Sequence, residues 1–267
     1  MARAAGDSNY YHFILKRENG KYDNGVGVSL VRVTHVIKST LAAPQLIPWA
    51  YRQTVDNISG LVTQFYQQVA AETQQELYDT LTDSDMLDEW LKQNHMRPDD
   101  VRDERAGQGQ SAHRYLEKLC HLLLDEGAET AWKKADIMLR ADPESYEGAI
   151  SKWWLDKATT LVNSEIVLPS FKHGYCGTVD LAHYTDDGLT ITDLKTRKPK
   201  ATAYDSDHAQ TGAYAIAWEE LYGDRPDTRT VLVARADGTY TEYSSDGIER
   251  EVFLDLLSVF NRLKGVK

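Results

Sequence analysis

The stretch that decides the fold runs from Cys176 to Thr196 and reads CGTVDLAHYTDDGLTITDLKT. Two runs of alternating apolar and polar residues flank Asp187-Gly188, a pattern that predicts a β-hairpin. If Asp187-Gly188 forms a two-residue loop, Asp180 lies opposite Lys195, and if the loop has four residues, Asp180 lies opposite Asp193. Because side chains alternate along a strand, both registers put Asp180, Asp193 and Lys195 on one face of the sheet.

Two carboxylates and an ammonium on one sheet face favour metal-assisted phosphate chemistry. Hard oxygen ligands suit Mg²⁺, which keeps several waters and binds a substrate phosphate. A neighbouring lysine can offset charge that builds up in the transition state. Taken alone, Asp193 and Lys195 could equally be a surface ion pair, so the interpretation depends on the motifs around them.

Two further pairs of residues lie one helical turn apart in segments that we expect to be helical. His113 and Glu117 form the first pair, and Gln210 and Tyr214 form the second. Residues at i and i+4 share a helix face, so each pair can point at one site. A solvated His/Glu pair and a half-buried tyrosine with a polar neighbour are the simpler interpretations.

The N-terminal part of the chain predicts strands and then helices. We expect strands over residues 10–16 and 28–33, and a helix capped by Thr34 that stops near Pro44. Residues 48–96 have a helical pattern, and another helix is expected to begin beyond Gly109.

The C-terminal part predicts a helix over residues 205–222, a strand over 230–234 and a final helix over 249–264. We interpret the apolar face of that final helix as core packing; its members are Val252, Phe253, Leu256, Leu257, Phe260 and Leu263. The order helix, hairpin, helix, strand, helix fits an α/β layer structure.

Taken together, these motifs resemble the RecB-like branch of the PD-(D/E)XK nuclease superfamily, and the likeness covers roughly residues 107–235. No single motif is specific, but all four occur in the family's order. They are Gly109-x-x-x-His113-x-x-Leu116-Glu117, Gly177-Thr178-x-Asp180, Asp193-x-Lys195-Thr196 and Gln210-x-x-x-Tyr214. The upstream segment is similar, more weakly, to DNA exonucleases of phages and of mitochondrial genome maintenance.

The resemblance implies a restriction-endonuclease-like core, a mixed β-sheet flanked by helices, at residues 106–267. It makes residues 1–105 a mainly helical N-terminal extension that could arch over the site.

The resemblance also implies a role for each matching residue. It assigns metal binding to His113, Asp180, Asp193 and the backbone carbonyl of Leu194. Lys195 would be the catalytic lysine, with Asp193, Asp180 and Glu117 as further catalytic residues. We expect a structural role for Glu165, which could also reach a second metal. The residues expected to bind DNA or to support the site are Gln210, Tyr214, Arg197 and Lys198.

Mg²⁺ is the expected cofactor, with Mn²⁺ as a substitute. The chain has two cysteines, which cannot hold the four-cysteine iron–sulfur cluster of some relatives. A net charge of −11 speaks against coating nucleic acid by charge alone, but a local cationic channel is compatible with it. With no apolar stretch of membrane-spanning length, we expect a cytoplasmic protein. The resemblance implies that a bacterium or a phage encodes it.

We therefore expect a Mg²⁺-dependent DNA exonuclease that prefers single-stranded ends. The possible stacking platforms are Trp49, Tyr51, Phe65 and Tyr66. One alternative is a recombination exonuclease that resects duplex ends, and another is an inactive nuclease-like DNA-binding module. A third is an acidic interaction protein. The sequence specifies no oligomeric state.

Overall fold

A computed structural model describes residues 2–4, 9–16, 22–41, 50, 52–60, 62, 79–80, 82–124, 129–157, 160–245 and 247–265. The chain divides into two compact units, one formed by Met1–Ala42 with Ser111–Lys267 and the other by Ala43–Gln110. The sequence-based boundary at residue 105 differs from this division. The N-terminal strands belong to the first unit because β3 (Tyr22–Arg32) pairs in parallel with β5 (Tyr175–Thr185).

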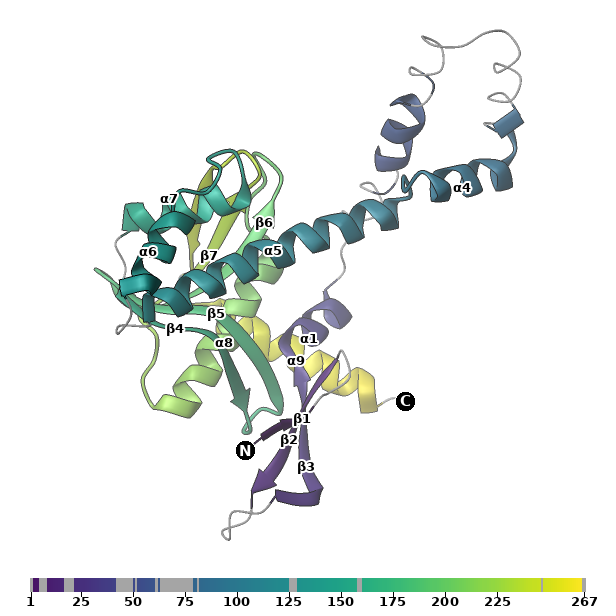
Figure 1. Cartoon of the computed structure of the whole chain (residues 1–267). Helices are drawn as coiled ribbons and strands as arrows, with labels where there is room; N and C mark the ends of the chain where they lie inside the picture. The colour runs from purple at the N-terminus through teal and green to yellow at the C-terminus, as the bar shows by residue number, and fades with distance from the viewer. Residues whose placement is uncertain are drawn as a thin grey trace. The chain divides into compact units, whose positions relative to one another are not determined.

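Eight strands of the described residues form one sheet, in which β5 has β4 on one side and both β3 and β6 on the other (Figure 1). The β3–β5 and β6–β7 pairs are parallel, and the other pairs are antiparallel. This mixed sheet confirms the predicted α/β class. The remaining strands are β1 (Ala2–Ala4), β2 (Tyr10–Lys16), β4 (Thr160–Ser170), β6 (Gly188–Arg197), β7 (Thr228–Arg235) and β8 (Tyr240–Ser244).

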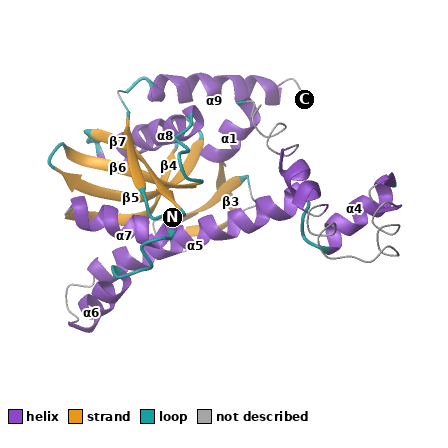
Figure 2. Cartoon of the chain, turned by 90° about the horizontal axis from the view of Figure 1, so that it is seen from above, coloured by secondary structure: helices purple, strands orange, loops and turns teal. Residues whose placement is uncertain are grey.

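Helices cover both faces of the sheet in the first unit (Figure 2). One core contains Val179, Ile191 and Phe253, and the core on the opposite face of the sheet contains Leu116 and Trp153. Among the described helices, none is long and apolar enough to cross a membrane. One face carries α1 (Val33–Thr40), α8 (Asp205–Tyr222) and α9 (Glu249–Gly265); the other carries the part of α5 (Pro98–Leu124) from Ser111 onward, α6 (Glu129–Met138) and α7 (Tyr146–Lys157).

Two helix starts differ from the sequence-based expectation. The N-cap of α1 is Arg32, without a side-chain capping bond, so Thr34 lies inside the helix. The helix expected beyond Gly109 begins at Pro98, which suits the first helical position and is followed by acidic residues that favour the positive end of the helix dipole. Glycine inside a helix costs only about 1 kcal/mol relative to alanine, so Gly107 and Gly109 do not end it.

Several expectations concern residues outside the described ranges. The possible stacking residues all lie outside the described ranges; they are Trp49, Tyr51, Phe65 and Tyr66. Of the predicted helical region 48–96, the described part includes α4 (Ser84–Gln93), whose N-cap Asp83 accepts hydrogen bonds from two backbone N–H groups.

The β5–β6 hairpin adopts the register that aligns Asp180 with Asp193. Its pairs run from Thr185↔Gly188 to Leu181↔Thr192, around an Asp186-Asp187 loop. Further back along the same edge, β5 pairs with β3 only at Tyr175 and Cys176. Residues 177–180 therefore lie where β3 and β6 diverge, and this opening in the sheet is where the candidate site is built.

A buried histidine, His183, lies on the same hairpin, three residues beyond Asp180 on β5. The His183 ring Nε2 is 2.8 Å from Thr192 Oγ1, and the ring stacks edge-on against Trp153 at 5.6 Å. Burial lowers the pKa of His183 to about 4, although the charge of Glu242 opposes the shift. The folded protein therefore keeps this ring neutral below the pH at which an unfolded histidine becomes protonated.

We expect His183 to destabilise the fold as pH falls from about 6.5 to about 4, because only the unfolded chain takes up its proton in that window. The dependence on pH should reach about 1.4 kcal/mol per pH unit. Denaturant unfolding at a series of pH values gives the free energy of unfolding of the metal-free wild type and of His183→Phe. The contribution of His183 is the difference between the two plots of this free energy against pH. Equal slopes in the two proteins would contradict the prediction. Site carboxylates with raised pKa values change the stability with pH in the opposite direction. Their contribution is the same in both proteins, so it cancels in the difference.

Candidate metal centre

Asp180 lies in the opening between the diverging strands and links three elements. Its Oδ2 accepts a hydrogen bond from the backbone N–H of Leu194 on β6, at 2.6 Å. Its Oδ1 lies 3.1 Å from Nδ1 of His113, which reaches it from α5. Burial alone would raise the pKa of this carboxyl, but His113, Lys195 and the Leu194 N–H together lower it. Asp180 is therefore a buried carboxylate held in its charged form.

Glu165 joins this pair from the neighbouring strand. The β4–β5 pairs Ser164↔Leu181 and Ile166↔Val179 flank it, so it lies opposite Asp180. Its φ of +49° is in the left-handed region, which costs a non-glycine residue on the order of 1–2 kcal/mol. Such strain persists where the surrounding structure enforces it, and it is concentrated at functional sites.

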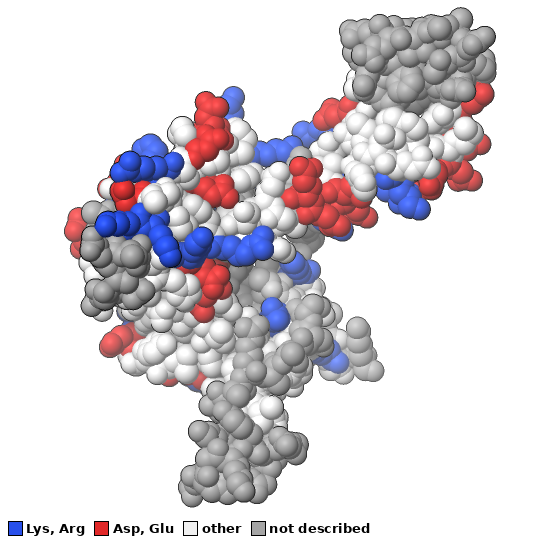
Figure 3. Space-filling view, viewed as in Figure 1, with Lys and Arg blue, Asp and Glu red and all other residues white. Residues whose placement is uncertain are grey.

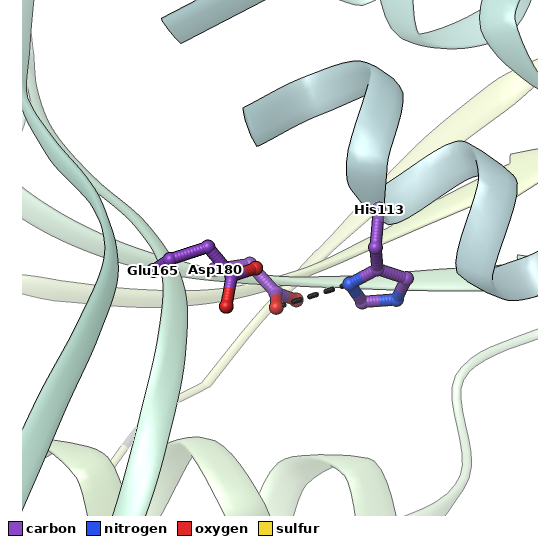
Figure 4. A group of neighbouring side chains, drawn as sticks. All are labelled: His113, Glu165 and Asp180. Carbon is purple, nitrogen blue, oxygen red and sulfur yellow. Dashed lines mark hydrogen bonds and ion pairs between the residues drawn. The ribbon is translucent and has the colours of Figure 1, made fainter. Parts of the chain in front are cut away.

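Ligand atoms of His113, Glu165 and Asp180 all lie within 4.8 Å of one another. Figure 4 shows the two carboxylates and the imidazole converging from β4, β5 and α5. Burial and the charge of Asp180 raise the pKa of Glu165 to about 7, with His113 opposing. The raised pKa shows that the neighbouring cations do not fully offset the negative charge of the two carboxylates, and a divalent cation would do so. Two carboxylates and one imidazole fit Mg²⁺ or Mn²⁺.

Leu194 can add a backbone ligand on the same side. Its N–H points into the opening toward Asp180. Within a strand, the N–H and C=O of one residue point to the same side, so the Leu194 carbonyl also faces the opening. The role of this carbonyl as a metal ligand, which the resemblance implies, stays a prediction.

Asp193 is the predicted ligand that lies outside the three-residue group. Its Oδ2 is 2.6 Å from Nζ of Lys195, and its Oδ1 accepts a hydrogen bond from Nε2 of Gln210 at 3.0 Å. Burial and Asp180 raise the pKa of Asp193 to about 6, and Lys195 opposes the shift. Asp193 thus holds the lysine and the glutamine next to the group formed by His113, Glu165 and Asp180.

Gln210 and Tyr214 reach the site from α8, as the one-turn spacing predicted. The Gln210 Oε1 accepts a hydrogen bond from Lys195 Nζ at 3.3 Å, and its Nε2 lies 2.5 Å from the Tyr214 hydroxyl. Tyr214 is buried against Gly177, where a Cβ would come within 2.3 Å of its ring. The glycine of the Gly-Thr-x-Asp motif therefore makes room for this tyrosine.

Strict alternation along β5 does not account for how these groups meet. Val179 and Ala182 pack in the core beneath α8, whereas Leu181 packs in the opposite core. An odd spacing cannot leave Val179 and Ala182 on one face of a regular strand, so the alternation is interrupted next to Asp180. The interruption lets Asp180 reach α5 while Asp193 contacts α8.

The other predicted site residues, Glu117, Arg197 and Lys198, are not part of the group formed by His113, Glu165 and Asp180. Glu117 is partly exposed, and its carboxylate lies 3.7 Å from His121. Arg197 forms an ion pair at 2.6 Å with Asp207 near the start of α8 and stacks on Tyr204. The structure therefore gives Arg197 a stabilising contact, whereas Lys198 is exposed.

A small cavity of about 160 Å³ borders the site beside Tyr214. The Arg32 guanidinium stacks at 4.4 Å on the ring of Tyr11, whose hydroxyl is 2.7 Å from Thr178 Oγ1. Among the described residues no carboxylate pairs with Arg32, and its Nε is buried without a hydrogen bond. A planar guanidinium in this state suits a phosphate oxygen. No motif in the sequence singled out Arg32.

We expect Glu165, rather than Glu117, to determine metal affinity, because only Glu165 brings its carboxylate within 4.8 Å of both His113 and Asp180. Calorimetric titration with Mn²⁺ should show Glu165→Gln losing at least about tenfold in affinity, since even residues behind the ligands contribute that much. Glu117→Gln should change the affinity less than about threefold. Glu144→Gln, an exposed loop residue, controls for the loss of one negative charge. A large loss in Glu117→Gln with none in Glu165→Gln would reverse the assignment.

No protein-family model and no curated protein match this chain. A solved structure described as "Crystal structure of SSO0001" matches with a TM-score of 0.29 and 13% sequence identity, over 55% of this chain and 74% of that one. A likeness at this level carries no argument about the site.

Proposed function

We propose that this chain is a Mg²⁺-dependent deoxyribonuclease of the RecB-like kind, an exonuclease that hydrolyses phosphodiester bonds. The observation that carries the proposal is the convergence of all four sequence motifs on one site. His113, Asp180 and Glu165 form a possible metal group, and the Asp193, Lys195, Gln210 and Tyr214 contacts adjoin it. Apart from Glu165, which belongs to none of the motifs, the order and identity of these residues agree with the family that the sequence resembles.

Each residue has a task in such a reaction. A bound Mg²⁺ would polarise a phosphoryl oxygen and lower the pKa of a bound water. Lys195 presents three N–H groups, and two acceptors, on Asp193 and Gln210, lie against them among the described residues. Its ammonium can therefore still donate to a phosphate oxygen as negative charge develops. Asp193 and Gln210 orient the ammonium, and Tyr214 orients Gln210.

Cationic groups near the site would hold the DNA backbone. Arg32 borders the site through the cavity that it shares with Tyr214, and Lys198 follows the end of β6. Figure 3 shows a band of Lys and Arg side chains over α5 and α6, and the exposed basic residues there include Arg114, Lys118, Lys133 and Lys134. Local positive charge of this kind can bind phosphates despite the net charge of −11, and its effect weakens as salt rises.

Removing the Lys195 charge should lower the cleavage rate by at least about 10²–10³-fold, because a charge that stabilises the transition state is lost. Metal affinity should stay within a few-fold, since Lys195 is not a ligand. Cleavage of end-labelled DNA by Lys195→Met, with Mn²⁺ titration of the same variant, measures both quantities. Lys172→Met, which removes an exposed lysine from the β4–β5 turn, serves as the matched control. Near wild-type cleavage by Lys195→Met would show that the catalytic lysine is wrongly assigned.

Activity should require Mg²⁺ or Mn²⁺ and a free end of single-stranded DNA. Linear and circular forms of single- and double-stranded DNA, each with Mg²⁺, Mn²⁺ or EDTA, test both requirements together. We expect rapid loss of linear single strands, little loss of circular ones and none in EDTA.

Other outcomes identify the alternatives. Equal digestion of circular and linear single strands would exclude an end requirement, and full activity in EDTA would exclude a metal enzyme. Rapid resection of blunt duplex would favour the recombination-type exonuclease. DNA binding without cleavage of any substrate would favour the inactive module.

A further inference from the structure

Helix α9 carries a second apolar row that the core does not use. Phe253, Leu257 and Phe260 are buried, as the sequence predicted. Val252 and Leu263, which the sequence also assigned to the core, are 40% and 55% exposed, and Val259 is 45% exposed. With the partly buried Leu256 between them, the exposed residues follow a four, three, four spacing, which is the seam pattern of two packed helices.

This row is long and accessible. The preceding Ile248 is 63% exposed and extends it by one turn, so it spans 15 residue steps, or about 22 Å at 1.5 Å per residue. In Figure 2 α9 lies outside α8 and α1, as the outermost helical layer of this face. Scattered exposed apolar residues are ordinary, but a continuous row on one helix marks an interaction surface.

Charged residues beside the row indicate which partner fits. Glu251 and Asp255 are exposed near the start of α9, and Arg262 is exposed near its end. At 100° per residue these three side chains fall on the same flank of the row. Within the described part of the chain, no ion pair engages any of them. The flank is therefore acidic at one end and basic at the other.

We propose that α9 packs antiparallel against α9 of a second copy of this chain, forming a two-fold symmetric dimer. Antiparallel packing centred near residues 255–256 places Val252 opposite Val259 of the partner subunit and brings the acidic end of each flank to the basic end of the other. A two-fold interface must be self-complementary. Here the apolar row meets itself and Glu251 meets Arg262 of the partner subunit, whereas the two copies of Asp255 meet near the axis and oppose the pairing. The proposal is independent of the proposed nuclease activity.

Sedimentation equilibrium of the full chain over a range of concentrations tests the dimer. We expect a concentration-dependent mass that approaches twice 30.2 kDa. Val259→Glu should leave a monomer, because it puts a charge into the seam at an exposed position that the fold does not need. Leu155→Glu, at an apolar residue on α7 that is at least as exposed, should dimerise like the wild type. A wild type that stays monomeric at about 100 μM, or a Val259→Glu protein that still dimerises, would overturn the proposal.

Charge exchange tests the antiparallel direction. Glu251→Arg and Arg262→Glu, each made alone, should raise the dissociation constant on the order of tenfold, because each creates two like-charge contacts in the symmetric interface. The double variant Glu251→Arg with Arg262→Glu should return to within about threefold of the wild type. If the double variant is as weak as the single ones, the antiparallel pairing is wrong. Circular dichroism of each variant checks that the fold is kept.

Discussion

The hydrogen bonds of the Asp180 carboxylate are the constraint on which the rest of the site depends. This side chain occupies the opening where β5 has left β3 and has not yet met β6, and it accepts the Leu194 N–H that would otherwise lack a partner. Its other oxygen contacts His113 and so ties α5 to the sheet. A buried backbone N–H without a partner is costly, so the same contact stabilises the fold and shapes the site.

The site brings together groups that repel one another, and the fold tolerates them because each has a fixed contact. Burial raises the pKa of both Glu165 and Asp193, whereas His113 and Lys195 keep Asp180 charged. Buried charges cost free energy unless they are paired, so the Lys195–Asp193 ion pair offsets part of that cost. The strained backbone of Glu165 adds to the free-energy cost of the site. The proposed metal ion would then add stability as well as reactivity, because a ligand that binds only the folded state stabilises it.

The two helical layers contribute different halves of the site. From α5, on one face of the sheet, comes an imidazole, and from α8, on the other face, come an amide and a phenol. They meet only because the sheet is open between β3 and β6 and because Gly177 leaves space for Tyr214. Helix α9 lies on the outer side of the α8 layer, away from the sheet, and its apolar row is exposed. Self-association and phosphate chemistry would thus use separate surfaces of the same unit.

The sequence by itself determined the α/β class, the bounds of β2 and α8, and the placement of His113, Asp180, Lys195, Gln210 and Tyr214 at one site, because helical spacing and motif order are local properties. Strand alternation alone did not, because it is interrupted next to Asp180. Tertiary structure alone left Asp193 outside the candidate metal group and brought Glu165 into it, since strand pairing joins residues far apart in the chain. Continuing the β4–β5 pairing from Ser170↔Tyr175 places Glu165 opposite Asp180, so this neighbour follows once that turn is known. The left-handed backbone of Glu165 has no signature in the local sequence. The sequence likewise could not predict that Val252 and Val259 are exposed, because periodicity shows that a helix face is apolar but not what covers that face.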